Sequence, residues 1–161
     1  MYFDVYTIAG LLTLFVVVAS FFVSFNTAVD KSVATPPLSG FVTVSINDII
    51  LVRDAKDRLS IDESFAPKLT AIAETHKLMV IVTVQGDKEA LEALEVINAS
   101  FISKLVPEHR IIFSDTEEGR ISIVRQLQPS IHYDTSEAVI SALTDKTPKL
   151  IIITSPDSIL S

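Results

Sequence analysis

The hydrophobic pattern separates an apolar N-terminal run from a longer region in which apolar and polar segments alternate. Residues 5–29 carry no charged side chain. At ~1.5 Å per residue, a helix of about 25 residues extends about 37 Å and can cross a ~30 Å hydrocarbon core. Residues 14–23 are apolar on nearly all faces, unlike an amphipathic core helix. No Lys or Arg precedes the run and no convincing cleavage site follows it, unlike a signal peptide.

We therefore predict a transmembrane anchor at residues 1–27, with a cleaved signal peptide and a buried core helix as the alternatives. The charges that flank the apolar run are too few and too balanced to predict its orientation. Residues 28–40 contain Pro36 and Pro37 among small polar residues. Such a composition breaks helices and favours extended chain, so this segment is expected to be a short tether.

Residues 41–161 are expected to form one α/β domain, because strand-like and helix-like segments alternate along them. β-branched or continuous apolar runs predict strands at residues 41–46, 78–84, 110–114, 131–133 and 149–154. Residues 49–52 either continue the first strand or form a further short one. Helical spacing predicts helices at residues 62–76, 87–101, 120–127 and 136–143. The alternation implies right-handed crossovers, so we predict a three-layer Rossmann-like domain with a mainly parallel sheet of about five strands.

One of these helices has a marked inner face and a clear start. Asp87 follows the Gln85–Gly86 turn and is expected to be the N-cap. The buried face of this helix is expected to carry Leu91, Leu94, Ile97 and Phe101.

Composition narrows the function classes. The formal net charge of −7 argues against a nucleic-acid footprint and against docking on anionic lipid through a basic patch. The chain has no cysteine, which excludes disulfides and thiolate chemistry, and its three histidines lack the spacing of a helical zinc site. The glycine-rich phosphate loops and the GxSxG elbow are absent. We therefore expect no cofactor, no metal, no small-molecule substrate and no nucleic-acid partner.

Polar residues follow several predicted strands, in a layout that resembles the haloacid-dehalogenase-like phosphatases. That family places two Asp residues after the first strand, a Ser or Thr after the second, and acidic residues after the fourth. By this resemblance Ser45 stands where the nucleophilic Asp belongs and Asn47 where the acid/base Asp belongs. Thr83 matches the second motif, and Asp134 matches the last acid.

The resemblance implies a site without catalysis. The phosphatase mechanism needs a carboxylate nucleophile and enough negative charge to hold Mg²⁺, and neither Ser45 nor Asn47 supplies them. Asp48 is out of register by one residue, which on a strand places it on the other face. The alternative is that Ser45 and Thr83 are strand-end residues that make only local bonds.

The most specific stretch is residues 116–135, which read TEEGRISIVRQLQPSIHYDT. It is similar to the signature TE-x-GR-x-x-x-VRQL-x-P-x-x-H-x-DT of the peroxisome assembly protein 22 family, especially its plant branch. The signature residues, which we take as structural or partner-binding candidates, are Glu117, Gly119, Arg120, Val124, Arg125, Gln126, Leu127, Pro129, His132, Asp134 and Thr135.

This resemblance implies a function at the peroxisome. The expected protein is a single-pass peroxisomal membrane anchor with its C-terminal domain in the cytosol. It would bind and co-activate a ubiquitin-conjugating enzyme of the peroxin four type, in recycling of the import receptor, and would not itself be an enzyme. The alternatives are a membrane-tethered haloacid-dehalogenase-like phosphatase or pseudophosphatase, and a generic membrane-anchored adaptor.

The same stretch also has a purely structural interpretation. Gly119 is expected to allow a turn with positive φ before the helix, and Pro129 to end that helix. Asp134 and Thr135, or Ser136, are expected to cap the next helix. The inner face of the first helix is expected to carry Ile123, Val124 and Leu127.

The two signature arginines cannot act together. Arg120 and Arg125 lie about 140° apart on a helix that turns ~100° per residue, so they do not form one fork. Each is expected either to brace a carboxylate or a loop carbonyl inside the domain or to contact a partner.

Overall fold

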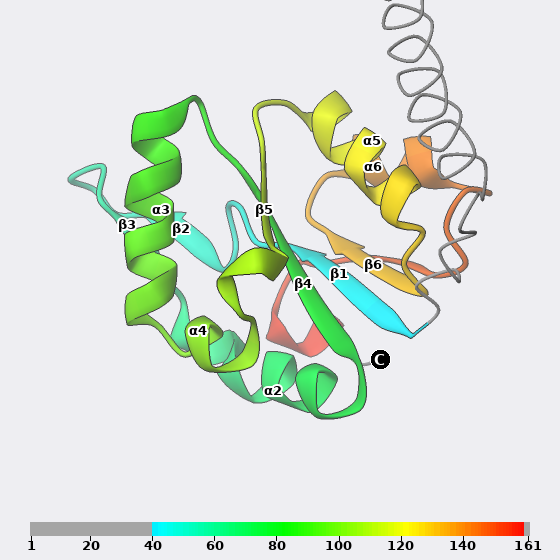
Figure 1. The fold of residues 1–161 in the computed structure, drawn as a ribbon, viewed down its shortest axis with the longest axis horizontal. Helices are drawn as coiled ribbons and strands as arrows, with labels where there is room; N and C mark the ends of the chain where they lie inside the picture. Colours follow the sequence, from blue (N-terminus) through cyan, green and yellow to red (C-terminus); the bar gives the residue numbers. More distant parts are fainter. Residues whose placement is uncertain (1–39, 160–161) are drawn as a thin grey trace, which may run out of the picture. The chain divides into compact units, whose positions relative to one another are not determined.

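A five-stranded parallel sheet forms the centre of the computed structural model, which describes residues 40–159 (Figure 1). The strand order is β5-β4-β1-β6-β7, and every neighbouring pair is parallel. The strands are β1 Phe41–Ser45, β4 Lys77–Thr83, β5 Ile111–Ser114, β6 Ile131–Asp134 and β7 Leu150–Ile152. The chain adds strands on one side of β1 and then crosses to the other. This topology confirms the predicted Rossmann-like parallel sheet.

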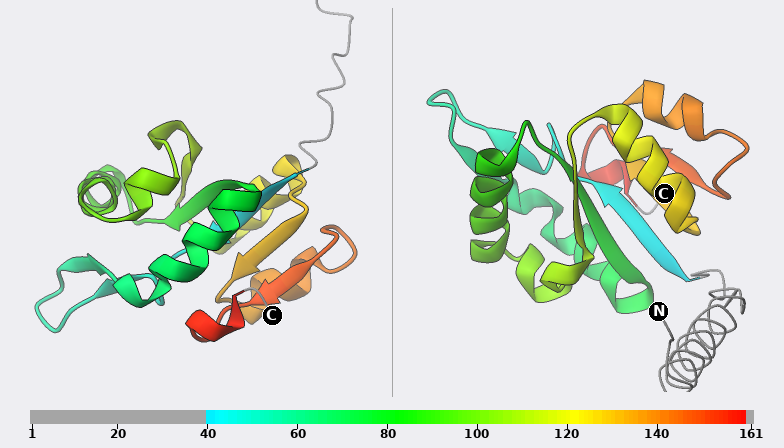
Figure 2. Two further views of the ribbon diagram at one scale, coloured as in Figure 1. Left: turned by 90° about the horizontal axis from the view of Figure 1, so that it is seen from below. Right: turned by 45° about the horizontal axis from the view of Figure 1, so that its top comes forward.

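Helices cover both faces of this sheet (Figures 1 and 2). The helices are α2 Ala66–Thr75, α3 Asp87–Ala99, α4 Ile102–Leu105, α5 Glu117–Leu127 and α6 Glu137–Leu143. Short 3-10 turns cover Glu63–Phe65, Glu108–Arg110 and Pro156–Ser158. Helices α5 and α6 contact each other, and α6 packs on β6 and β7.

Strand β4 shows how the two faces are built. Val80 and Val82 are fully buried in the larger core cluster, which also contains side chains of α2, α3 and α4. Ile81 belongs to a second buried cluster with Val124 of α5 and Val139 of α6. Because successive strand residues point to opposite faces, the two clusters lie on opposite sides of the sheet. This explains the continuous apolar run that predicted the strand.

A separate antiparallel hairpin follows β1, and only half of it was expected. Strands β2 Leu51–Arg53 and β3 Leu59–Ile61 pair with each other outside the main sheet (Figure 2). Residues 49–52 therefore do not continue β1, and the prediction missed β3. Asp54 is a turn-forming residue that could have indicated this hairpin. Its carboxylate accepts hydrogen bonds from the Lys56 and Arg58 backbone N–H groups in the connecting turn.

Helix α3 differs from the prediction at its start and on its inner face. Its N-cap is Gly86, with φ 117°, and Asp87 is the first helical residue. Asp87 thus favours the helix through its charge in the first turn rather than by capping. Ala93 and Ile97 are the buried residues, whereas Leu91 is 64% exposed, so its assignment to the buried face was wrong.

No helix within residues 40–159 is long and apolar enough to cross a membrane. The predicted anchor at residues 1–27 lies outside the described residues, as does the tether up to residue 39.

Candidate functional site

The carboxyl ends of three adjacent strands bring polar side chains together. Ser45 ends β1, Thr83 ends β4 and Asp134 ends β6. These strands are neighbours in the order β4-β1-β6, with Val44 paired to both Val80 and Tyr133. The order in which strands are added to the sheet reverses between β1 and β6. Open α/β sheets bind their ligands at the carboxyl ends of the strands beside such a reversal point.

Arg120 of α5 joins the three strand ends. Its Nη1 donates to Ser45 Oγ at 3.1 Å and to Thr83 Oγ1 at 3.0 Å. Its Nη2 donates to Glu117 Oε1 at 3.3 Å, and its Nε lies 3.1 Å from Asp134 Oδ2. The Arg120 side chain is 4% exposed. The guanidinium therefore braces the inside of the domain.

Arg120 and its strand-end partners Ser45, Thr83 and Asp134 form a polar centre, which His132 extends into the sheet. The Asp134 and His132 side chains are both 0% exposed, and His132 Nε2 lies 3.1 Å from Asp134 Oδ2. The other carboxylate oxygen of Asp134 accepts from the Ser136 backbone N–H at 2.8 Å. His132 Nδ1 lies 2.8 Å from Thr43 Oγ1. A hydrogen on Nε2 would point at the carboxylate, which leaves Nδ1 to accept from the Thr43 hydroxyl.

Asn47 holds β1 to β4. Its Nδ2 donates to the Thr83 carbonyl oxygen, and its Oδ1 accepts from the Thr83 backbone N–H, both at 2.7 Å. Asp48 follows in a left-handed turn with φ 66°, not on a strand as expected, and it lines a cleft. The Ser45 and Thr83 hydroxyls share one partner, Arg120, which lies 75 and 37 positions further along the chain.

The polar residues at the strand ends do not fit Mg²⁺, the metal that the phosphatase resemblance implies. The Asp134 oxygens already face Arg120, His132 and the Ser136 N–H. The position between the strand ends holds the positive guanidinium of Arg120, which repels a cation. Within residues 40–159 there is also no group of three or more His, Cys, Asp or Glu side chains placed to hold a metal.

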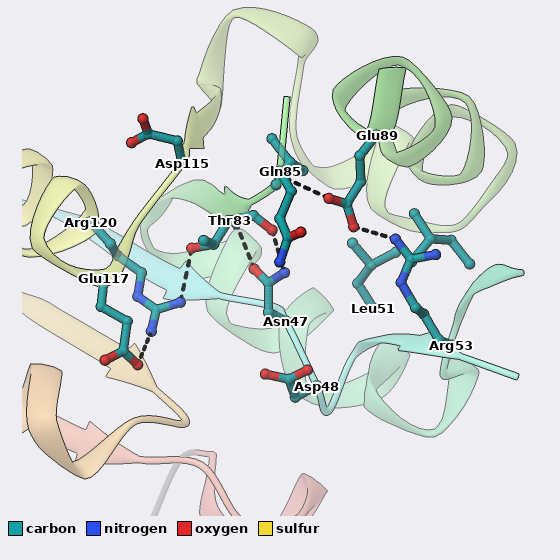
Figure 3. A pocket seen from close by; sticks show the side chains of 12 residues that line it. Asn47, Asp48, Leu51, Arg53, Thr83, Gln85, Glu89, Asp115, Glu117 and Arg120 are labelled. Carbon is teal, nitrogen blue, oxygen red and sulfur yellow. Dashed lines mark hydrogen bonds and ion pairs between the residues drawn. The ribbon is translucent and has the colours of Figure 1, made fainter. Parts of the chain in front are cut away.

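A cleft of about 370 Å³ opens beside Arg120 (Figure 3). Arg120 and Glu117 form one wall, and Arg53 and Glu89 pair on the opposite wall. The Gln85 backbone N–H, and then Arg53, lower the pKa of the Glu89 carboxyl, against the effect of burial. Four further cleft residues, Arg53, Gln85, Glu89 and Asp115, are not predicted from the sequence. Arg53 is brought here by the β2–β3 hairpin, which was only half expected.

Helix α5 begins earlier than expected, and Gly119 has a different role. Thr116 is the N-cap, and its hydroxyl accepts from the Gly119 backbone N–H at 3.0 Å. Gly119 is therefore helical and makes no turn of positive φ. A Cβ at this position would lie 2.6 Å from Ser114 Oγ, so glycine permits close packing of α5 on the end of β5.

The remaining signature residues divide between the interior and the surface. Val124 and Pro129 are buried, Leu127 and Thr135 are half-buried, and Arg125 and Gln126 are exposed. Gln128, with φ 51°, ends α5 immediately before Pro129. Ser136 caps α6 by accepting from the Val139 backbone N–H, and Asp134 supports this turn through the Ser136 N–H.

The model of the family described as "Peroxisome biogenesis protein 22, Haloacid dehydrogenase-like domain" matches residues 43–160. The chain belongs to the peroxisome biogenesis protein 22 family. A comparison with curated proteins finds no match. Membership in this family gives the chain a role in peroxisome biogenesis and an association with the peroxisome. The matched region includes the β1 end, the cleft and the whole signature.

Proposed function

We propose that this chain is a single-pass peroxisomal membrane anchor and co-activator of a ubiquitin-conjugating enzyme of the peroxin four type. In this role it serves recycling of the import receptor, with residues 41–161 in the cytosol. The observation that carries the proposal is the family match over residues 43–160, which includes the signature at 116–135.

The polar centre supports a role without catalysis of its own. A phosphatase of this fold needs a free carboxylate at the end of its first strand. Ser45 stands there instead and accepts a hydrogen bond from Arg120, while the Asn47 amide bonds with the Thr83 backbone. These interactions hold strand ends together and leave no nucleophile facing the cleft from these two positions.

The apolar run at residues 5–29 supports anchoring. A protein without a reactive group can raise the effective concentration of its partner at a membrane. It can also shift the conformational population of the partner. Only the second effect persists when no membrane surface is shared.

The test separates these two effects. The full chain is placed in lipid vesicles, and recruitment of the purified ubiquitin-conjugating enzyme is measured by flotation, with a chain lacking residues 1–40 as control. Ubiquitin-chain formation by the enzyme is then measured with the full chain in detergent micelles. We expect recruitment only with the full chain and faster chain formation in micelles.

The outcomes discriminate clearly. Recruitment without faster chain formation would leave the anchoring role alone. Absence of binding by a folded chain would remove the proposal and favour an adaptor for another partner.

A further inference from the structure

An apolar groove of about 400 Å³ lies beside the cleft, at the carboxyl ends of β4 and β5. Val84, Ala90, Phe113 and Ile123 supply its apolar surface. Phe113 belongs to β5, which is the edge strand of the sheet, so the groove lies at a border of the domain. The groove and the cleft share Val84 and Asp115, which makes them one continuous surface.

Unpaired carboxylates border this surface. Five carboxylates and two guanidinium groups line the groove and the cleft together. Both guanidinium groups are already paired within it, Arg53 with Glu89 and Arg120 with Glu117. Within residues 40–159, Asp48, Asp87 and Asp115 form no ion pair. The surface therefore combines an apolar depression with uncompensated negative charge.

We propose that this groove and cleft dock the partner protein, through a segment that carries a large apolar side chain next to Lys or Arg. The apolar side chain fills the groove between Ala90 and Ile123. The basic side chain reaches Asp115, and Asp48 lies elsewhere along the same cleft. Naming this partner as the ubiquitin-conjugating enzyme rests on the proposed function.

The charge balance argues for a basic segment. An acidic or neutral segment would leave Asp87 and Asp115 uncompensated, and like charges across an interface oppose binding. A second copy of this chain would bring the same acidic surface to an isologous contact, which is unfavourable for the same reason. Complementary charge also speeds association at low salt.

Two variants with matched controls test the proposal, all in the full chain in detergent micelles. Ala90→Arg fills the groove with a residue that favours helices, and Ala138→Arg places the same change at an exposed position of α6. Asp115→Lys reverses a charge just after β5, and Glu108→Lys does so just before it. Circular dichroism verifies that each variant is folded.

Binding of the purified enzyme is measured by titration at low and at physiological salt. We expect the Kd to rise about tenfold or more for Ala90→Arg and several-fold for Asp115→Lys, with both controls within about twofold of the wild type. The Asp115→Lys variant should also lose part of the salt dependence of binding, because it removes an attractive charge.

The outcomes separate the two proposals. If the wild type binds and both groove variants bind equally well, the groove assignment is overturned and the proposed function stands. If the folded wild type does not bind the enzyme, both are overturned. If Ala90→Arg changes only self-association of the chain, the occupant is a second copy and the docking proposal is overturned.

Discussion

Two arginines on opposite walls of one cleft show how burial changes the role of the same side chain. Arg120 is 4% exposed and contacts Ser45, Thr83, Glu117 and Asp134. Arg53 is 36% exposed and pairs with Glu89 and Asp57 on the hairpin side. Removing one partner of a buried ion pair leaves an uncompensated charge, whereas water replaces the partner of an exposed one. The contacts of Arg120 therefore stabilise the fold. The ion pairs of Arg53 can break with little loss, because water replaces the missing partner.

The largest expected effect is that of Arg120→Met. The change leaves Asp134 buried without its cation, so the free energy of unfolding should fall by about 3–5 kcal/mol. Urea denaturation of the full chain measures it. Arg125→Met, at an exposed position of the same helix, should change stability by less than about 0.5 kcal/mol. Equal effects at the two positions would contradict the stabilising role assigned to the buried contacts of Arg120.

Gly119→Ala sharpens the comparison by moving the helix that carries Arg120. The added Cβ meets Ser114 Oγ at 2.6 Å, so we expect a loss of about 1–3 kcal/mol. Replacing Ser114 with Ala removes that oxygen. The double variant, followed by the same denaturation measurement, should lose less than the sum of the two single changes. Strict additivity would show that this close contact does not limit packing.

Arg53→Met should have a smaller effect than Arg120→Met, because Arg53 is partly exposed and its ion pairs are screened. The difference from the wild type should shrink as salt is raised. Thermal unfolding at two salt concentrations measures this. A loss as large as that of Arg120→Met would show that exposure does not govern these pairs.

The smallest effect concerns pH. The pKa of Glu89 is lowered from its ordinary value of 4.5, first by the Gln85 backbone N–H and then by Arg53. The depressed pKa stabilises the fold above the ordinary value, and this contribution is lost as pH falls through the folded pKa. The stability difference between the wild type and Glu89→Gln should therefore be largest near neutral pH and diminish below about pH 4.5. A difference that grows toward acid would reverse the assigned sign.

Local patterns in the sequence predicted most of the sheet. The apolar run at residues 78–84 predicted β4 because a strand covered on both faces needs apolar side chains throughout. The hairpin partner β3 has three residues, too few for a period-two pattern to be visible. The start of α5 was misjudged because Gly119 was interpreted by its conformational freedom and not by its lack of volume.

The site was predictable only in its components. Ser45, Asn47, Thr83 and Asp134 are identified by the resemblance to the phosphatase layout, because each lies at or near the end of a predicted strand. Arg120 connects Ser45, Thr83 and Asp134 through contacts between separate segments of the sequence, which no spacing rule encodes. The groove beside β5 combines residues of β5, α3 and α5, so it exists only in the folded domain.

The Asn47 amide stands in the way of phosphatase chemistry at this strand end. The Asn47 side chain makes two hydrogen bonds to the Thr83 backbone, as a peptide group of an adjacent strand would. These bonds require both a donor and an acceptor. An ionised Asp at this position can only accept hydrogen bonds, so it could not donate to the Thr83 carbonyl oxygen as the Asn47 Nδ2 does. A carboxylate at position 45 would in turn pair with Arg120 and lose its nucleophilic freedom. Introducing Asp at positions 45 and 47 alone would thus destabilise the strand ends without producing a working site.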